Sequence, residues 1–185
     1  MRKLALIAAL LAGPAGATGL EITVAGEGAN GVITIDLLDE VAPNHVAQIV
    51  ALAEEGAYDD VVFHRVIDGF MAQTGDVAFG KMGDPEFSMK MAGRGGSSRP
   101  DLKAEFSDVP YARGTVGMAR SQDPDSANSQ FFIMFAPGDF LNGQYTVVGQ
   151  VTGGMDVVDA IKRGQGRNGE VFGEPDRMVS VKVIE

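Results

Sequence analysis

Residues 63–76 of the chain read FHRVIDGFMAQTGD. They overlap two predicted strands, 61–67 and 70–74, because both runs are short, apolar and rich in side chains that favour β-structure. Arg65 stands inside the first apolar run, where a bare charge is costly unless its head reaches solvent or a partner. It is therefore either a surface arginine with its head in water or a cation that the molecule uses.

Short strand patterns are scattered along the rest of the chain. In residues 31–37, Ile33, Ile35 and Leu37 share one face by the period of two that is typical of a half-buried strand. The other predicted strands are 115–119, 130–135, 145–151 and 178–184. Glycine accounts for 25 of the 185 residues, well above the usual share of roughly 7%. This excess suits many short strands joined by turns.

Two segments carry helical periodicity instead. The first, 43–55, begins with Pro43 near the first helical position and is followed by Gly56. The second, 155–163, ends in two basic residues and is followed by Gly164. Because the strands do not alternate regularly with helices, the pattern favours an antiparallel barrel or sandwich whose open ends the two helices cover.

The first 17 residues have the composition of a cleavable secretory signal peptide. Positions 1–3 are Met-Arg-Lys, positions 4–12 form an apolar run of nine residues, and positions 15–17 read Ala-Gly-Ala. A membrane anchor is the alternative, but nine residues are far fewer than the roughly 20 that span a bilayer. We therefore expect residues 18–185 to be exported as one domain without a membrane anchor.

Charge and composition exclude several classes of function. Without Arg2 and Lys3, 13 basic residues face 25 acidic ones, a net charge of −12. Such a surface repels nucleic acid, whose phosphates are bound by Lys and Arg. The chain has no Cys, which excludes disulfides, a thiol nucleophile and Cys-ligated metal, and two His residues leave little for a zinc site. We expect no metal and no cofactor.

Two glycine-rich stretches resemble nucleotide-binding motifs but lack the context of such motifs. Residues 75–81 match the start of a phosphate loop, yet Met82 replaces the hydroxyl residue that would hold Mg²⁺. Residues 164–169 match the spacing of a dinucleotide fingerprint but follow a predicted helix instead of a strand. His45 and His64 lack ligand-spaced carboxylates and are interpreted as structural or surface residues. The stretch from about 77 to 111 is predicted to be a long loop, which is often functional or mobile.

Amides and aromatic residues fall on shared strand faces near the lone cation. Met71 and Gln73 lie on one face of their strand, and Gln130 and Phe132 lie together on another. With Arg65, these side chains can form a concave apolar pocket with a few polar groups, which is the usual form of a binding site for a small group.

These segments resemble the cyclophilin family of peptidyl-prolyl cis/trans isomerases. The resemblance covers nearly all of residues 18–185 and includes Gly-Val-Ile-Thr-Ile at 31–35, Thr-Val-Gly-Met-Ala at 115–119, Asn-Ser-Gln-Phe-Phe-Ile at 128–133 and Val-Val-Gly-Gln-Val at 147–151. It implies an all-β fold, a closed eight-stranded antiparallel barrel capped by two α-helices. That fold agrees with the strand-rich pattern and its two helices.

The resemblance also implies a set of site residues. The catalytic set is Arg65, Gln73 and Phe70. The substrate-binding set is Met71, Ala119, Arg120, Gln130, Phe132, Phe140, Leu141 and Tyr145. Arg65 matches the family's catalytic arginine, and the segment at Ala119 and Arg120 matches the backbone that pairs with substrate.

Three of these positions depart from the residues that many family members carry. Arg120 replaces a small polar residue, Tyr145 stands where many members have His, and Phe140 stands where many eukaryotic members have Trp. Phe140 makes the sequence resemble bacterial members of the family. In a bacterium, a protein with a cleaved signal peptide is exported to the periplasm or secreted, and we expect one of these locations.

The implied activity is rotation about Xaa-Pro bonds in polypeptides that are folding or being exported, performed by a monomer without cofactor. There are two alternatives to this enzymatic function. The chain could be a non-catalytic peptide-binding module or holdase that uses the same groove, or a structural envelope protein whose site has decayed. A cation aimed at the prolyl nitrogen favours the enzyme, since binding proline alone does not require one.

Overall fold

The computed structural model describes residues 18–185, so the predicted signal peptide at 1–17 lies outside the described residues. Nine strands form one sheet: β1 (Gly19–Ala25), β2 (Gly31–Leu37), β3 (Val61–Val62), β4 (Arg65–Ile67), β5 (Met71–Thr74), β6 (Thr115–Met118), β7 (Phe131–Met134), β8 (Val147–Gly153) and β9 (Arg177–Ile184). The helices are α1 (Pro43–Glu54), α2 (Met155–Ala160) and the short 3₁₀ helix η1 (Asp139–Leu141).

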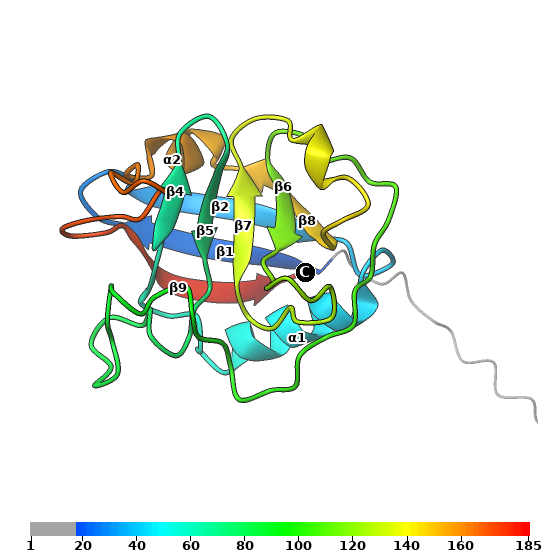
Figure 1. The fold of residues 1–185 in the computed structure, drawn as a ribbon, viewed down its shortest axis with the longest axis horizontal. Helices are drawn as coiled ribbons and strands as arrows, with labels where there is room; N and C mark the ends of the chain where they lie inside the picture. Colours follow the sequence, from blue (N-terminus) through cyan, green and yellow to red (C-terminus); the bar gives the residue numbers. More distant parts are fainter. Residues whose placement is uncertain (1–17) are drawn as a thin grey trace, which may run out of the picture.

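The sheet is antiparallel throughout and strongly curled. Its strand order is β3-β9-β1-β2-β8-β6-β7-β5-β4. The long strands β1, β2 and β9 run across the shorter strands β4 to β7, and the two groups enclose the core between them as a half-barrel (Figure 1). The mostly β prediction with two helices is therefore confirmed.

The closed eight-stranded barrel is not confirmed, because the sheet has nine strands in an open order. Its two edges, β3 and β4, come from the single segment predicted as a strand at 61–67. Val61 and Val62 pair with β9, but beyond them Phe63 N donates to Asp176 O at 2.9 Å and Val66 N donates to Gly169 O at 2.7 Å. The segment thus changes partners at residues 63 and 64, which divides the predicted strand into two.

Strand β1 was not predicted, although its sequence alternates clearly. Leu20, Ile22 and Val24 are buried, whereas Glu21 and Thr23 are only partly so. β1 pairs with β2 on one side and β9 on the other, so it lies in the middle of the long-strand layer.

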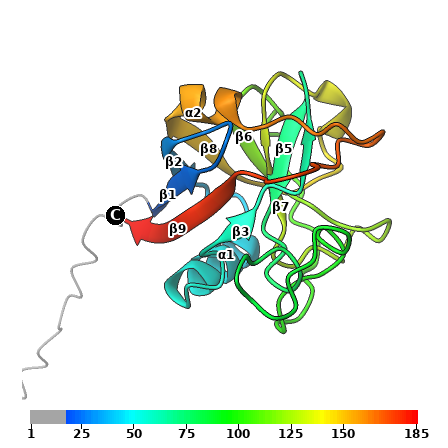
Figure 2. The ribbon, with the colours of Figure 1, turned by 90° about the vertical axis from the view of Figure 1, so that its left-hand side faces the viewer.

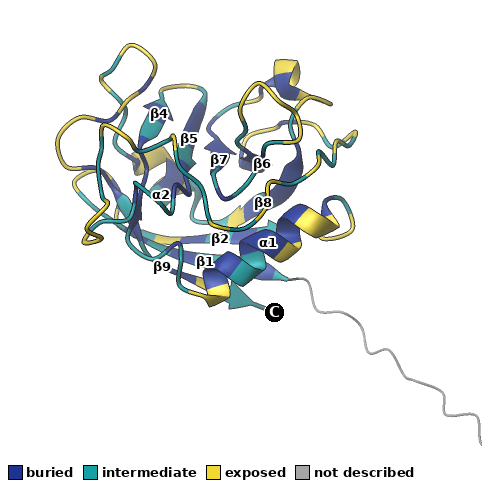
Figure 3. Cartoon of the chain, turned by 60° about the horizontal axis from the view of Figure 1, so that its bottom comes forward, coloured by how far each residue is buried: buried dark blue, intermediate teal, exposed yellow. Residues whose placement is uncertain are grey.

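The two helices lie on opposite sides of the sheet (Figure 2). Helix α1 turns its buried face, which includes Val46, Ile49 and Leu52, toward the strands, and its other face is exposed (Figure 3). Helix α2 is shorter than predicted, because Ile161 leaves the helical conformation with φ −54° and ψ 128° and enters the core. The prediction extended this helix to residue 163 because basic residues are common in the last turn of a helix. Nothing in the sequence indicated that the backbone turns at Ile161.

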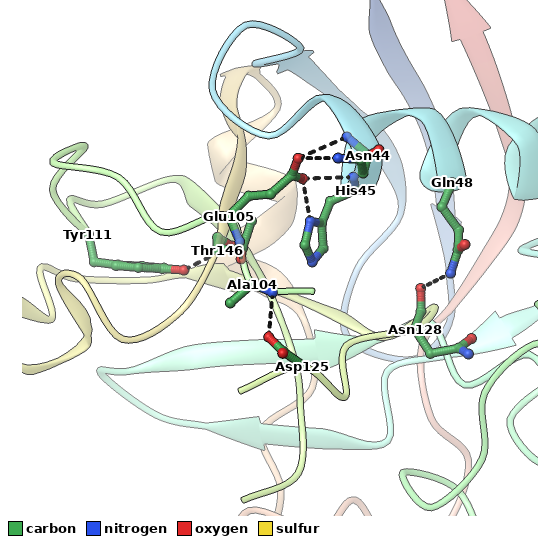
Figure 4. Close-up of polar contacts among 9 residues, drawn as sticks. All are labelled: Asn44, His45, Gln48, Ala104, Glu105, Tyr111, Asp125, Asn128 and Thr146. Atoms are coloured by element: carbon green, nitrogen blue, oxygen red, sulfur yellow. Dashed lines mark hydrogen bonds and ion pairs between the residues drawn. The ribbon is translucent and has the colours of Figure 1, made fainter. Parts of the chain in front are cut away.

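The predicted long loop is confirmed, and a partly buried contact anchors it to α1. Glu105 accepts from the backbone N–H groups of Asn44 at 3.2 Å and His45 at 3.0 Å, and from the His45 ring at 2.5 Å (Figure 4). The residue before the helix, Ala42, offers no capping side chain, so Glu105 satisfies amide donors that the first turn leaves free. The contact ties the loop to the helix 60 residues earlier.

Candidate active site

Three neighbouring strands place the predicted cation, amide and aromatic ring on one face. Arg65 on β4 is directly opposite Gln73 on β5, and Gln73 is opposite Phe132 on β7. Residues opposite each other in an antiparallel pair point to the same side of the sheet. The register therefore fixes the order cation, amide, ring across the surface.

A chain of hydrogen bonds holds the Arg65 guanidinium in place. Nη1 donates to Gln73 Oε1 at 3.1 Å, and Nε donates to the backbone oxygen of Asn168 at 2.9 Å. Gln73 Nε2 in turn donates to Gln130 Oε1 at 2.9 Å, and Gln130 Nε2 donates to Gly95 O at 2.7 Å. Both amide side chains are thereby oriented, and one edge of the guanidinium is fixed.

Arg65 keeps donors for a further partner. Within residues 18–185, its Nη2 donates no hydrogen bond, although guanidinium carries five N–H groups. The side chain is half-buried. Burial lowers the pKa of Arg65, while the nearby Glu170 carboxylate raises it. Arginine remains charged at neutral pH even so, which leaves a positioned, half-buried cation at the site.

Beside this cation lies a pocket with an apolar floor. Met71, Phe132 and Leu141 are buried, with side chains exposed by 6% or less. The Phe132 ring is stacked on Tyr111 with centroids 5.7 Å apart, and Tyr145 meets it edge-on at 6.0 Å. Aromatic contacts on two sides fix the orientation of the Phe132 ring.

The rim of the pocket is formed by aromatic and cationic groups that are exposed or partly buried. Phe140 is 66% exposed, and its ring lies 5.4 Å from that of Phe70. The Arg120 guanidinium lies over the Tyr145 ring at 4.3 Å and donates to the backbone oxygen of Gln144 at 2.9 Å. Arg120 thus packs along the rim and is not an unattached surface charge.

The resulting cavity has a volume of about 370 Å³, which falls in the range for small-ligand sites. Its size and apolar floor fit a compact aliphatic ring, and the guanidinium beside it can donate to a polar atom attached to that ring. Within residues 18–185 there is no group of three or more His, Cys, Asp or Glu side chains that could hold a metal ion. No helix of this part of the chain is long and apolar enough to cross a membrane.

Residues 20–183 match the family model described as cyclophilin type peptidyl-prolyl cis-trans isomerase/CLD. The chain belongs to the cyclophilin family. A probable peptidyl-prolyl cis-trans isomerase of Brucella suis is 58% identical over 154 residues, which are 83% of this chain and 78% of the relative. Peptidyl-prolyl cis-trans isomerase B of Escherichia coli K12 is 38% identical over 72% of this chain and 79% of its own.

A solved structure supports the same family. The crystal structure of the cyclophilin AquaCyp293 from Hirschia baltica matches with a TM-score of 0.69 and 26% identity. The match covers 89% of this chain and 73% of that one.

The cyclophilin fold gathers most of the predicted site residues around one cavity. Ten of the eleven line it, and Gln130 instead lines a neighbouring cavity of about 300 Å³ while bonding to Gln73. Gln144 lines the first cavity but was not predicted, although it directly precedes Tyr145. Tyr111, behind Phe132, was also missed, since it ends the long loop and shows no strand or helix pattern.

Two backbone supports of the cyclophilin site had no signal in the sequence. Gly95 O and Asn168 O hold Gln130 and Arg65, and neither interaction depends on the supporting residue's side chain. Asn168 belongs to the stretch 164–169 that was rejected as a dinucleotide motif. The structure gives that stretch a different role, a tight loop beside β4 in which Val66 N donates to Gly169 O at 2.7 Å.

Both histidines are buried, so the structural interpretation holds and the surface one does not. Burial lowers the pKa of His64 to about 4, against the opposing effect of Asp76. His64 is therefore protonated near pH 6.5 in the unfolded chain but only near pH 4 in the folded chain. Protonation favours the unfolded chain, so the protein loses stability as the pH falls from 6.5 to 4.

We expect this difference to reduce the free energy of unfolding by about 3 kcal/mol between pH 7 and pH 4. The measurement is urea unfolding of the wild type and His64→Gln across this range. The variant should lack this part of the pH dependence, whatever its stability at pH 7. Parallel curves for the two proteins would show that His64 titrates normally in the folded state.

Proposed function

We propose that this cyclophilin accelerates rotation about Xaa-Pro bonds in polypeptides by non-covalent stabilisation of the twisted amide, with Arg65 as the donor to the prolyl nitrogen. The observation that supports this most directly is the placement of the Arg65 guanidinium, held by Gln73 and Asn168, beside a pocket large enough to hold a proline ring.

The reaction needs a group that binds the twisted amide more tightly than either planar isomer. An amide resists rotation by about 18–20 kcal/mol because nitrogen donates its lone pair into the carbonyl. At the twisted transition state that donation is lost, so the prolyl nitrogen becomes a better hydrogen-bond acceptor. A fixed guanidinium meets this change with a stronger interaction, which lowers the barrier.

Magnitudes show that Arg65 cannot act alone. Uncatalysed isomerisation takes tens of seconds or more, so a turnover of about 10³ per second requires an acceleration of roughly 10⁵, or about 7 kcal/mol. One preorganised donor in a water-poor site supplies about 2.7–4 kcal/mol. The remainder must come from the walls that hold the ring and exclude water, and from groups that fix the flanking chain.

The surrounding residues have distinct parts in this proposal. Met71, Phe132 and Leu141 hold the proline ring, and Phe70, Phe140 and Tyr145 exclude water at the rim. Gln73 and Gln130 orient the guanidinium and offer amide groups to the flanking peptide. Ala119 and Arg120 supply the backbone edge along which the substrate is bound.

The test of the activity is exchange between the cis and trans forms of an Xaa-Pro peptide, measured by NMR with residues 18–185 in substoichiometric amount. We expect faster exchange with an unchanged cis/trans ratio. Suppression of aggregation of an unfolded protein is measured with the same preparation. Suppression without faster exchange would support the holdase instead.

We further propose that the protein acts as a monomer in the periplasm or after secretion, with residues 1–17 removed as a signal peptide. The basic start, the apolar run and the small residues at positions 15 and 17 support this. Exported chains arrive unfolded with unsettled Xaa-Pro bonds, which this activity would help to settle. Fractionation and intact mass spectrometry should find the shortened chain outside the cytoplasm, and full-length protein in the cytoplasm would contradict export.

A further inference from the structure

A second cavity, larger than the one above Phe132, adjoins it at Arg65 and Gln73. Its volume is about 690 Å³, and it shares only these two residues with the first cavity. Two loops form its walls, the long loop at 89–94 and the loop at 166–173, and both lie near β4 (Figure 1). A polypeptide with its proline beside Arg65 is therefore next to this cavity as well.

The walls of this second cavity concentrate positive charge on an acidic protein. Lys90, Arg94 and Arg167 line it together with Arg65, and Glu170 is the one carboxylate among the lining residues. Residues 18–185 as a whole carry a net charge of −12. The cavity thus has a local charge opposite in sign to that of the molecule around it.

The three peripheral cations are also free of partners. Lys90, Arg94 and Arg167 make no side-chain hydrogen bond or ion pair with any residue in 18–185, whereas Arg99, Arg113, Arg163 and Arg177 each pair with a carboxylate. The lone Glu170 already accepts from the backbone N–H of Asn168 at 2.9 Å. Three cations with free donors around one cavity can accept an anionic group without breaking an existing contact.

The cavity also offers apolar surface beside the charges. Met89 and Val171 line it, and Phe172 stands at its edge with 60% of its surface exposed. Such a mixture suits a side chain with a short aliphatic stem and a charged end, because the stem can lie on the apolar surface while the head meets the cations.

We infer that this second cavity is a specificity subsite that binds an acidic side chain, Asp or Glu, of the substrate polypeptide near the proline that Arg65 acts on. The inference rests on the proposed function, since it takes Arg65 as the point where the two cavities meet. The two cavities meet at Arg65 and Gln73, and an extended chain advances about 3.3–3.6 Å per residue, so we place the acidic residue within about four positions of the proline.

The experiment compares kcat/KM for peptides that carry Glu, Gln or Lys at each of these positions on either side of one proline. For the wild type we expect kcat/KM of the Glu peptide to be about five- to tenfold higher than that of the Gln peptide at one position. At that position kcat/KM of the Lys peptide should be lower than that of the Gln peptide. The advantage should shrink when the salt concentration is raised, because exposed charges are screened.

Matched charge reversals locate the effect. In the double variant Arg94→Glu/Arg167→Glu, the ratio of Glu to Gln peptides should fall to about one or below. The control Lys103→Glu/Lys182→Glu also reverses two charges, at exposed positions outside the cavity, and should keep the wild-type ratio. A wild-type ratio near one at every position, or a ratio that survives the double reversal, would overturn the subsite.

The Gln peptide separates this inference from the proposed function. If the wild type isomerises the Gln peptide but shows no preference for Glu, the subsite fails and the activity stands. If it isomerises none of the peptides, the proposed function itself is contradicted.

Discussion

Arg65→Ala is expected to lower kcat/KM for Xaa-Pro isomerisation by about 10²- to 10³-fold. Alanine removes the one guanidinium whose position is fixed by both Gln73 and the backbone of Asn168 beside the apolar pocket. The interaction is strongest with the twisted amide, so kcat should fall at least as strongly as binding weakens. The measurement is cis/trans exchange by NMR over a range of peptide concentrations, without a coupled protease.

Arg65→Lys tests whether charge alone is sufficient. Lysine keeps the positive charge but lacks the planar guanidinium group. That group donates to Gln73 and Asn168 and has further N–H groups free for the substrate. We therefore expect it to recover only a small part of the lost activity. Lys182→Ala, at an exposed position of β9, should behave as the wild type. Near-normal activity of Arg65→Ala, with its fold shown intact by circular dichroism, would eliminate the proposed mechanism.

Asp76→Ala is expected to reduce the free energy of unfolding by about 3–5 kcal/mol. The Asp76 carboxylate is fully buried and accepts four backbone hydrogen bonds, from Ala78 and Phe79 through one oxygen and from Gly93 and Gly95 through the other, at 2.7–3.1 Å. Alanine would leave these donors without their acceptor. Urea unfolding at pH 7 measures the loss.

The same change is expected to reach the active site through the long loop. Gly95, held by Asp76, offers the backbone oxygen that orients Gln130, and Gln130 orients Gln73 beside Arg65. Asp76→Ala should therefore also lower kcat/KM under conditions where the variant is folded. Asp84→Ala is the matched control, because its carboxylate accepts one exposed bond from Glu86 in the same loop. Equal stabilities of the two variants would refute the anchoring role of Asp76.

The strand faces could be predicted because they depend on local periodicity. Ile33, Ile35 and Leu37 are buried as the alternation required, and Met71 and Gln73 point to the site together. For each strand face the prediction needed little information beyond the segment itself. The grouping of these faces in one pocket was a hypothesis that the family resemblance supported, because periodicity within a strand does not say which strands are neighbours; β5 and β7 pair although β6 separates them along the chain.

The parts that escaped prediction depend on contacts between distant segments. Asn168 O supports Arg65 across 103 residues of sequence, and Gly95 O supports Gln130 across 35. A backbone carbonyl carries no residue-specific pattern, so nothing in the sequence marked these two groups. The division of the 61–67 strand has the same origin, because its pairing beyond residue 62 is decided by the loop before β9.

The position of β9 in the sheet has a consequence for how the molecule is assembled. This strand is the last of the nine along the chain, yet it lies between β3 and β1, and its Ile184 is opposite Gly19. Until residues 177–184 are available for pairing, β1 and β3 present unpaired edges on which other chains could aggregate. Pairings between segments so distant in sequence also slow folding, which lengthens the time for which these edges are exposed.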